Sequence, residues 1–134
     1  MTTALITHDA CKLHDMGSGH PESPQRLAAI KDRLIASGID GLLQHHEAPL
    51  VSRAALLRVH TKDYIDSIEA KAPRAGLIQL DPDTAMNPHS LEAARRAAGA
   101  AVHGVDLVMT GKAQNAFCAV RPPGHHALSN RSMG

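Results

Sequence analysis

The feature that most constrains the fold is a long run of helical periodicity over residues 88–110. Apolar and mostly small side chains recur along one face of this run: Leu91, Ala94, Ala98, Ala101, Val102, Val105, Val108 and Met109. Gly99 and Gly104 interrupt the stripe and indicate close contact with a neighbouring element, and Gly111 ends it. Ser90 is the predicted N-terminal cap. The pattern therefore predicts one long helix packed closely against other structure.

Short apolar segments alternate with helical ones along the rest of the chain. Strands are predicted at residues 4–7, 42–48, 76–80 and 116–120, and helices at 24–37, 53–59 and 62–71. Ser23, Ser52 and Thr61 are the predicted caps of these helices, with Pro24 at the first helical position. Residues 81–84, Asp-Pro-Asp-Thr, predict a turn. This alternation predicts one α/β domain of 134 residues, a parallel β-sheet with flanking helices.

The composition excludes several classes of partner. Aromatic residues make up only 1% of the chain, so it offers no stacking platform for single-stranded nucleic acid. The net charge of +1 gives no reason to expect a nucleic-acid or membrane partner. Two cysteines, Cys11 and Cys118, do not make a disulfide framework and are interpreted as reduced thiols. With no signal peptide in view, we expect a cytoplasmic protein.

The residues with the most evident chemistry follow the strand predicted at 116–120. Arg121 comes next, two prolines then end any strand pairing, and Gly124 allows a turn that presents His125 and His126. Imidazoles exchange protons near neutral pH, and two adjacent ones repel when both are charged, so one can act as a base while the other tunes it. The same dipeptide at residues 45–46 has no turn chemistry around it and is interpreted as structural or exposed.

Metal binding by this histidine pair is the alternative. A catalytic zinc usually takes three protein ligands, and no carboxylate partner lies near His125 in the sequence. His14 and His20, with Asp9 and Asp15, could contribute imidazoles and a carboxylate. Each of these four residues taken singly is better interpreted as a polar loop residue.

The segment 121–127, Arg-Pro-Pro-Gly-His-His-Ala, resembles the signature of the histone deacetylase and acetylpolyamine amidohydrolase superfamily. Residues 20–27, residues 59–65, and Asp83-Thr84 with residues 115–117 match further parts of it in the expected order. The resemblance covers essentially the whole chain. It implies an arginase-like α/β fold with a central parallel sheet, and zinc-dependent hydrolysis of an N-acetyl amide on a lysine or a polyamine.

The resemblance also implies roles for individual residues. His126 would be the general base and later the acid toward the leaving amine, with His125 as its electrostatic partner. The residues expected at the pocket rim, where substrate binds, are His20, Pro21, Glu22, Asp83 and Gly134, with His14 and Asp81 nearby. Gly134 would begin a stretch that lines the tunnel.

The zinc ligands of this superfamily, and the group that stabilises its oxyanion, come after position 134. The expectation is therefore an N-terminal fragment that carries the proton-transfer pair, holds no zinc alone and is inactive alone. The alternative is a non-catalytic truncated protein that self-associates, or binds a partner, through the sheet edge beside the strand ending at Val120. Either way a homo-oligomer is expected. A small metal-binding protein that uses its own histidines is a third hypothesis.

Overall fold

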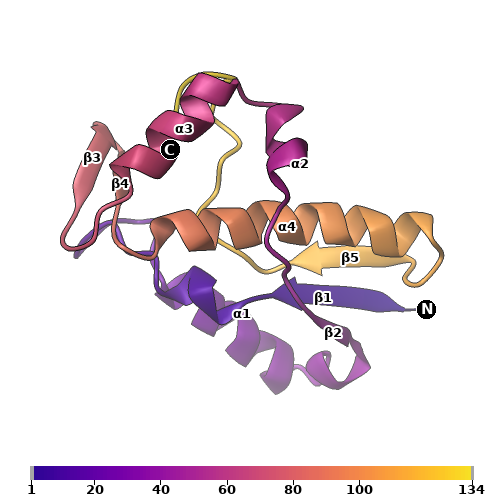
Figure 1. Cartoon of the computed structure of the whole chain (residues 1–134). Helices are drawn as coiled ribbons and strands as arrows, with labels where there is room; N and C mark the ends of the chain where they lie inside the picture. Colours follow the sequence, from indigo (N-terminus) through magenta and orange to yellow (C-terminus); the bar gives the residue numbers. More distant parts are fainter. Residues whose placement is uncertain (1, 134) are drawn as a thin grey trace.

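A three-stranded parallel sheet forms the centre of the protein, which a computed structural model describes over residues 2–133. Its order is β2 (Gln44–Glu47), β1 (Thr3–Thr7) and β5 (Asn115–Cys118), so that the first strand is central (Figure 1). Leu5 lies opposite His45 on one side and Phe117 on the other. The predicted α/β class with a parallel sheet is thereby confirmed.

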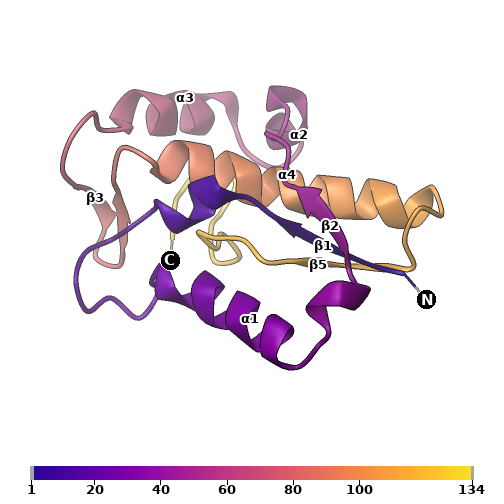
Figure 2. The ribbon, with the colours of Figure 1, turned by 90° about the horizontal axis from the view of Figure 1, so that it is seen from below.

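Helices cover both faces of this sheet. Figure 2 shows α4 (Ser90–Met109) on one face and α1 (Gln25–Ala36) on the other. Alternate residues of β1 divide between the two layers, because successive side chains of a strand point to opposite faces. The α4 layer buries Ala4 and Ile6, whereas Leu5 packs with Leu27 of α1. The core is aliphatic and rich in alanine, as the composition predicts.

The interruptions in the long helix mark close contacts, as predicted. A Cβ atom built on Gly104 would lie 3.2 Å from the Cβ of Ala116 and 3.3 Å from Cδ1 of Ile6, so this glycine lets α4 approach the sheet. At Gly99 the neighbour is backbone, because a Cβ there would lie 1.8 Å from the carbonyl oxygen of Pro49.

Most of the remaining elements gather around the N-terminal half of α4 (Figure 1). They are the short helices η1 (Asp9–Lys12) and α2 (Arg53–Leu57), the helix α3 (Lys62–Lys71), and the strands β3 (Ile78–Asp81) and β4 (Thr84–Met86). The short helix η2 (Asp40–Leu42) instead follows α1 on the far side of the sheet (Figure 2). The strands β3 and β4 form an antiparallel hairpin whose turn includes Pro82 and Asp83, where a turn is predicted. The three-residue strand β4 is too short to leave a recognisable pattern in the sequence. Within residues 2–133, no helix has the length and apolarity needed to cross a bilayer.

The predicted helix caps are right in two cases and wrong in two. The side chain of Ser52 accepts a hydrogen bond from the backbone of Ala55, and Thr61 does the same for Tyr64. Ser90, by contrast, is the first residue inside α4, with His89 at the cap position. The cap of α1 is Pro24 rather than Ser23, and no side chain caps that helix.

Candidate active site

A pocket of about 350 Å³ gathers most of the predicted site residues. Its walls are Met16, His20, Pro21, Glu22, Arg26, Asp83, Pro123, His125 and His126. They come from the loop before α1, the turn of the β3–β4 hairpin and the loop after β5. Segments more than a hundred residues apart in the sequence therefore line one pocket. The remaining predicted site residue, Gly134, lies outside the described residues.

His125 and His126 stand in the turn that follows β5. Ala127 donates its backbone N–H to the carbonyl of Gly124 at 3.0 Å, which closes the turn around the two histidines. Both side chains are exposed, and their ring centroids lie 4.2 Å apart with the planes inclined by 56°. The pair is thus presented together at the pocket surface, within reach of a bound molecule. The catalytic role of the two histidines stays a prediction.

His20 and Asp83 form a bridge across the pocket. The backbone N–H of Glu22 donates to Nδ1 of His20 at 3.1 Å, so the ring proton of His20 must be on Nε2. That nitrogen donates to Oδ1 of Asp83 at 3.1 Å. Both ring nitrogens of His20 are therefore occupied, and its bonds join the loop before α1 to the hairpin turn. The Asp83 side chain remains 76% exposed and accessible to a ligand.

Glu22 points inward rather than into solvent. Its two carboxylate oxygens accept hydrogen bonds from Nε and Nη2 of Arg121 at 2.9 and 2.8 Å, a bidentate pair with an arginine that is fully buried. Burial raises the pKa of Glu22, but the hydrogen bond and charge of Arg121, with His14 and Arg26, outweigh it and lower that pKa. Glu22 is consequently ionised at neutral pH. Whether it also contacts substrate, as predicted, stays untested.

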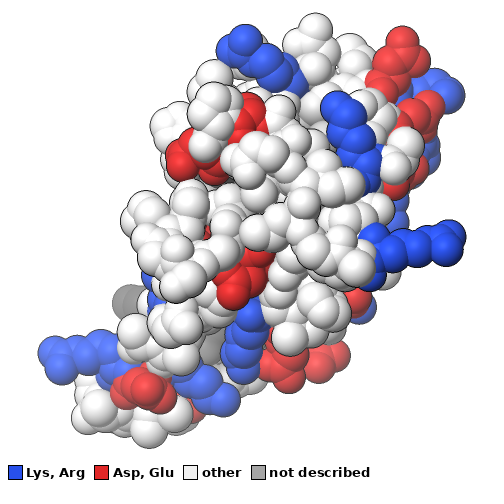
Figure 3. All heavy atoms as spheres, turned by 90° about the vertical axis from the view of Figure 1, so that its left-hand side faces the viewer, with Lys and Arg blue, Asp and Glu red and all other residues white. Residues whose placement is uncertain are grey.

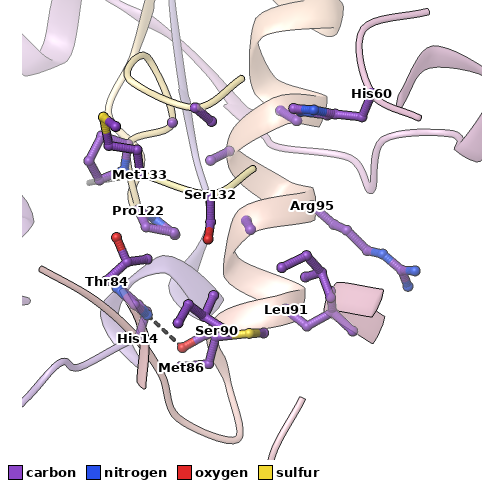
Figure 4. Close-up of a pocket in the computed structure, with 18 of the residues that line it drawn as sticks. His14, His60, Thr84, Met86, Ser90, Leu91, Arg95, Pro122, Ser132 and Met133 are labelled. Atoms are coloured by element: carbon purple, nitrogen blue, oxygen red, sulfur yellow. Dashed lines mark hydrogen bonds between the residues drawn. The ribbon is translucent and has the colours of Figure 1, made fainter. Parts of the chain in front are cut away.

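His14 is a buried imidazole next to this ion pair. Its Nδ1 lies 2.6 Å from Oγ of Ser90 (Figure 4), and its Nε2 lies 3.8 Å from Oε2 of Glu22, too far for a hydrogen bond. Burial, followed by the charge of Arg121, lowers the pKa of His14, so the ring is neutral at pH 7. The sequence shows Ser90 only as a cap candidate, so its contact with His14 was not predictable.

An apolar cavity of about 460 Å³ adjoins the pocket. It lies between α3, α4, the hairpin and the loop after β5, and Met86, Leu91, Pro122 and Met133 are among the residues that line it (Figure 4). Met16 and Pro123 line both spaces. Sequence reasoning missed this cavity because no periodic pattern marks a space enclosed by separate elements.

Charged side chains of both signs are interspersed on the face that looks out from the hairpin end of the molecule (Figure 3). No continuous patch of one sign covers that face.

The described residues do not fit a catalytic zinc ion. Among residues 2–133, no three histidine, cysteine, aspartate or glutamate side chains are placed to hold a metal, and such an ion needs three protein ligands. We therefore assign no catalytic step in this chain to a metal.

Comparison with known proteins places the chain in a family. The profile described as histone deacetylase domain matches residues 20–134. The chain therefore belongs to the histone deacetylase family. It is 41% identical over 117 residues to a histone deacetylase-like amidohydrolase of Pseudomonas aeruginosa, covering 87% of this chain and 30% of that protein.

Other deacetylases are also similar to this chain. A probable deacetylase of Archaeoglobus fulgidus is 34% identical over 132 residues, which cover 95% of this chain and 35% of that one. The human polyamine deacetylase HDAC10 is 33% identical over 143 residues, which cover 100% of this chain and 21% of that one. The crystal structure of the HDA15 HD domain matches with a TM-score of 0.91 and 33% identity, over 99% of this chain and 38% of that structure. The chain spans about a third or less of the curated relatives described here.

Proposed function

We propose that this chain forms the N-terminal portion of a zinc-dependent deacetylase that hydrolyses the N-acetyl amide of a lysine or a polyamine. The observation that carries the proposal is the pocket in which His125 and His126 face the loop at residues 20–22 and Asp83. Membership of the histone deacetylase family supports it. The names of two relatives, a deacetylase-like amidohydrolase and a polyamine deacetylase, support the reaction class.

Within this reaction His126 moves the proton. It takes a proton from the attacking water as the water oxygen bonds to the acetyl carbon, and it passes a proton to the amine nitrogen as the C–N bond breaks. Acetate and the free amine are the products. His125 stands beside it as its electrostatic partner, with 4.2 Å between the ring centroids. The metal chemistry of the family needs ligands that residues 2–133 do not supply, so their part is proton transfer and substrate placement.

Asp83 is the group that receives the polar part of the substrate. Its carboxylate is at the pocket rim, mostly exposed, and held in place by His20. A carboxylate there accepts hydrogen bonds from a peptide N–H or attracts the ammonium groups of a polyamine.

The proposed function is tested by the release of acetate from an acetyl-lysine peptide and from an N-acetylated polyamine. The protein as its gene encodes it, supplied with zinc, is expected to hydrolyse at least one of them, and a chelator is expected to stop the reaction. Residues 1–134 alone are expected to hydrolyse neither. Failure of the gene-encoded protein on both substrates would contradict the proposal. Chelator-sensitive turnover by residues 1–134 alone would contradict the proposal that these residues supply proton transfer and substrate placement but not the zinc ligands.

A second candidate function is self-association through β5. Within residues 2–133 this strand pairs only with β1, and the Phe117 side chain on it is 46% exposed. An edge strand with an apolar side chain pairs readily with another copy. We therefore propose that the polypeptide of residues 1–134 forms a dimer or a larger oligomer. The mass measured by light scattering is expected to fall when Phe117 is replaced by lysine. Val59→Lys, a substitution of an exposed apolar residue away from β5, is the control and should leave the mass unchanged. A monomeric mass at every concentration would rule this out.

A further inference from the structure

We propose that the buried ion pair between Arg121 and Glu22 is a positioning device, which sets how His125 and His126 are placed against the opposite pocket wall. Arg121 and Glu22 are positioning residues in this proposal and do not act on substrate. Its expected effect on kcat rests on the proposed function, whereas its expected effect on the placement of the two histidines does not.

Arg121 ties the end of β5 to two other segments. Beyond its bidentate pair with Glu22, its Nη1 donates to the carbonyl of Cys11 at 2.8 Å and also to the carbonyl of His14. Its side chain is 0% exposed. Four hydrogen bonds from one guanidinium therefore join the start of the histidine loop to η1, to the residues after η1 and to the loop before α1.

Glu22 carries the connection outward to the pocket rim. Its Oε1 also accepts a hydrogen bond from Nη1 of Arg26, in the first turn of α1, at 3.3 Å. Its backbone N–H binds Nδ1 of His20, whose other nitrogen binds Asp83. The network thus runs without a break from the buried guanidinium to the exposed carboxylate on the hairpin turn.

The other side of the pocket is coupled to Arg121 through the backbone. Only Pro122, Pro123 and Gly124 separate it from His125. Each proline ring restricts its own backbone dihedral angles, and Pro123 also restricts those of the residue before it. The orientation of the backbone at Arg121 therefore limits where the turn with the two histidines can lie. One ion pair consequently anchors both walls of the pocket, although its two members are 99 positions apart in the sequence.

Stability alone does not account for such a pair. The free energy needed to desolvate two charges is roughly equal to the free energy of their attraction, and well-packed apolar residues in their place often give a protein of similar stability. A planar, bidentate pair instead selects one relative orientation of the segments it joins. In this protein those segments carry the two histidines and the rim residues.

The test uses Glu22→Gln and Arg121→Lys in the protein as its gene encodes it. Each keeps the approximate shape of the side chain and weakens the bidentate geometry. Asp66→Asn is the control, because it weakens exposed ion pairs with Arg53 and Lys62 that are absent from the pocket. We measure kcat, KM, the thermal midpoint and the imidazole NMR signals of His125, His126 and His45.

Positioning predicts that kcat falls about 10- to 100-fold at a temperature where the variants are folded, while KM changes less than about twofold. The signals of His125 and His126 move and that of His45 does not, and Asp66→Asn leaves all of these at the wild-type values. A folded variant with a lower thermal midpoint but wild-type kcat and wild-type His125 and His126 signals would overturn the inference, since that is the result of a purely structural pair.

Acidification breaks the same pair without a substitution. The pKa of Glu22 is lowered from 4.5, so the ion pair is intact above that value and is lost as the pH falls through the lowered pKa. The charged or titratable groups that face Glu22 are Arg121 from the end of β5, His14 from the segment after η1 and Arg26 from α1.

Wild-type signals of His125 and His126 should show a transition below pH 4.5 that Glu22→Gln lacks. If the two histidines show no transition there, the inference is wrong. These signals need no turnover, so they test the positioning role even if the gene-encoded protein hydrolyses no acetylated amine. A failure of the positioning role can thereby be distinguished from a failure of the proposed deacetylase function.

Discussion

Replacement of His126 by alanine is expected to lower kcat for hydrolysis of an acetylated amine by about 10²- to 10⁴-fold. The proton from the attacking water then has no positioned acceptor, and the leaving amine has no positioned donor. The imidazole of His126 is exposed, so its removal creates no cavity in the core and the fold should persist. Steady-state kinetics on the protein as its gene encodes it, with circular dichroism to verify folding, measure the effect.

The matched control is His45→Ala. His45 belongs to the same kind of dipeptide, but it is exposed on β2, with its Nε2 bound to the carbonyl of Asp40 at 3.1 Å. Its removal should leave kcat within about twofold. Equal losses in the two variants would mean that neither loss reports proton transfer. An unchanged kcat in His126→Ala would remove His126 from the mechanism.

Gly99→Ala is expected to lower the free energy of unfolding by about 3 kcal/mol or more, the upper range for overpacked sites. The added Cβ would lie 1.8 Å from the carbonyl oxygen of Pro49 and 2.9 Å from the backbone nitrogen of Val51. Backbone cannot rotate away as a side chain can. The segment must shift, which disturbs the hydrogen bond from Val51 to the carbonyl of Arg95. The gain in helix propensity, about 1 kcal/mol, does not compensate.

Urea unfolding of the gene-encoded protein measures this loss, and Gly41→Ala is the control. No atom lies within 4 Å of a Cβ at Gly41, so that variant should change stability by less than about 0.5 kcal/mol. Two variants of equal stability would show that α4 and the segment at Pro49 are not closely packed in solution.

Much of the secondary structure could be predicted because its signals are local. The long helix and the caps at Ser52 and Thr61 depend on residues three or four positions apart, and they appear where predicted. The predicted apolar stripe is wrong as the buried face of α4, because Val102, Val105 and Met109 are exposed, whereas Ala93, Ala100 and Leu107 are buried. The cap error at Ser90, by contrast, arises partly from a contact between distant parts of the sequence. Ser90 has the chemistry of a cap, yet its hydroxyl is engaged by His14 and Asn87, contacts that periodicity does not encode.

The candidate site could be predicted as a set of residues but not as an arrangement. The strand, the Pro-Pro-Gly turn and the histidine pair are contiguous, so the sequence alone places His125 and His126 together at the end of a strand. It also marks the loop at residues 20–22 by resemblance. The bridge from His20 to Asp83 spans 63 positions and depends on how the hairpin folds back.

The sequence by itself determined the class of fold, the presentation of the two histidines and the resemblance to a family, because each depends on short contiguous motifs. Only the tertiary structure decided that Arg121 is fully buried and that its partner is Glu22. A charged residue after a strand has the same local pattern whether it faces solvent or the core. The difference arises when β1, β5 and the loop before α1 pack together and exclude water from a guanidinium that a carboxylate must then neutralise.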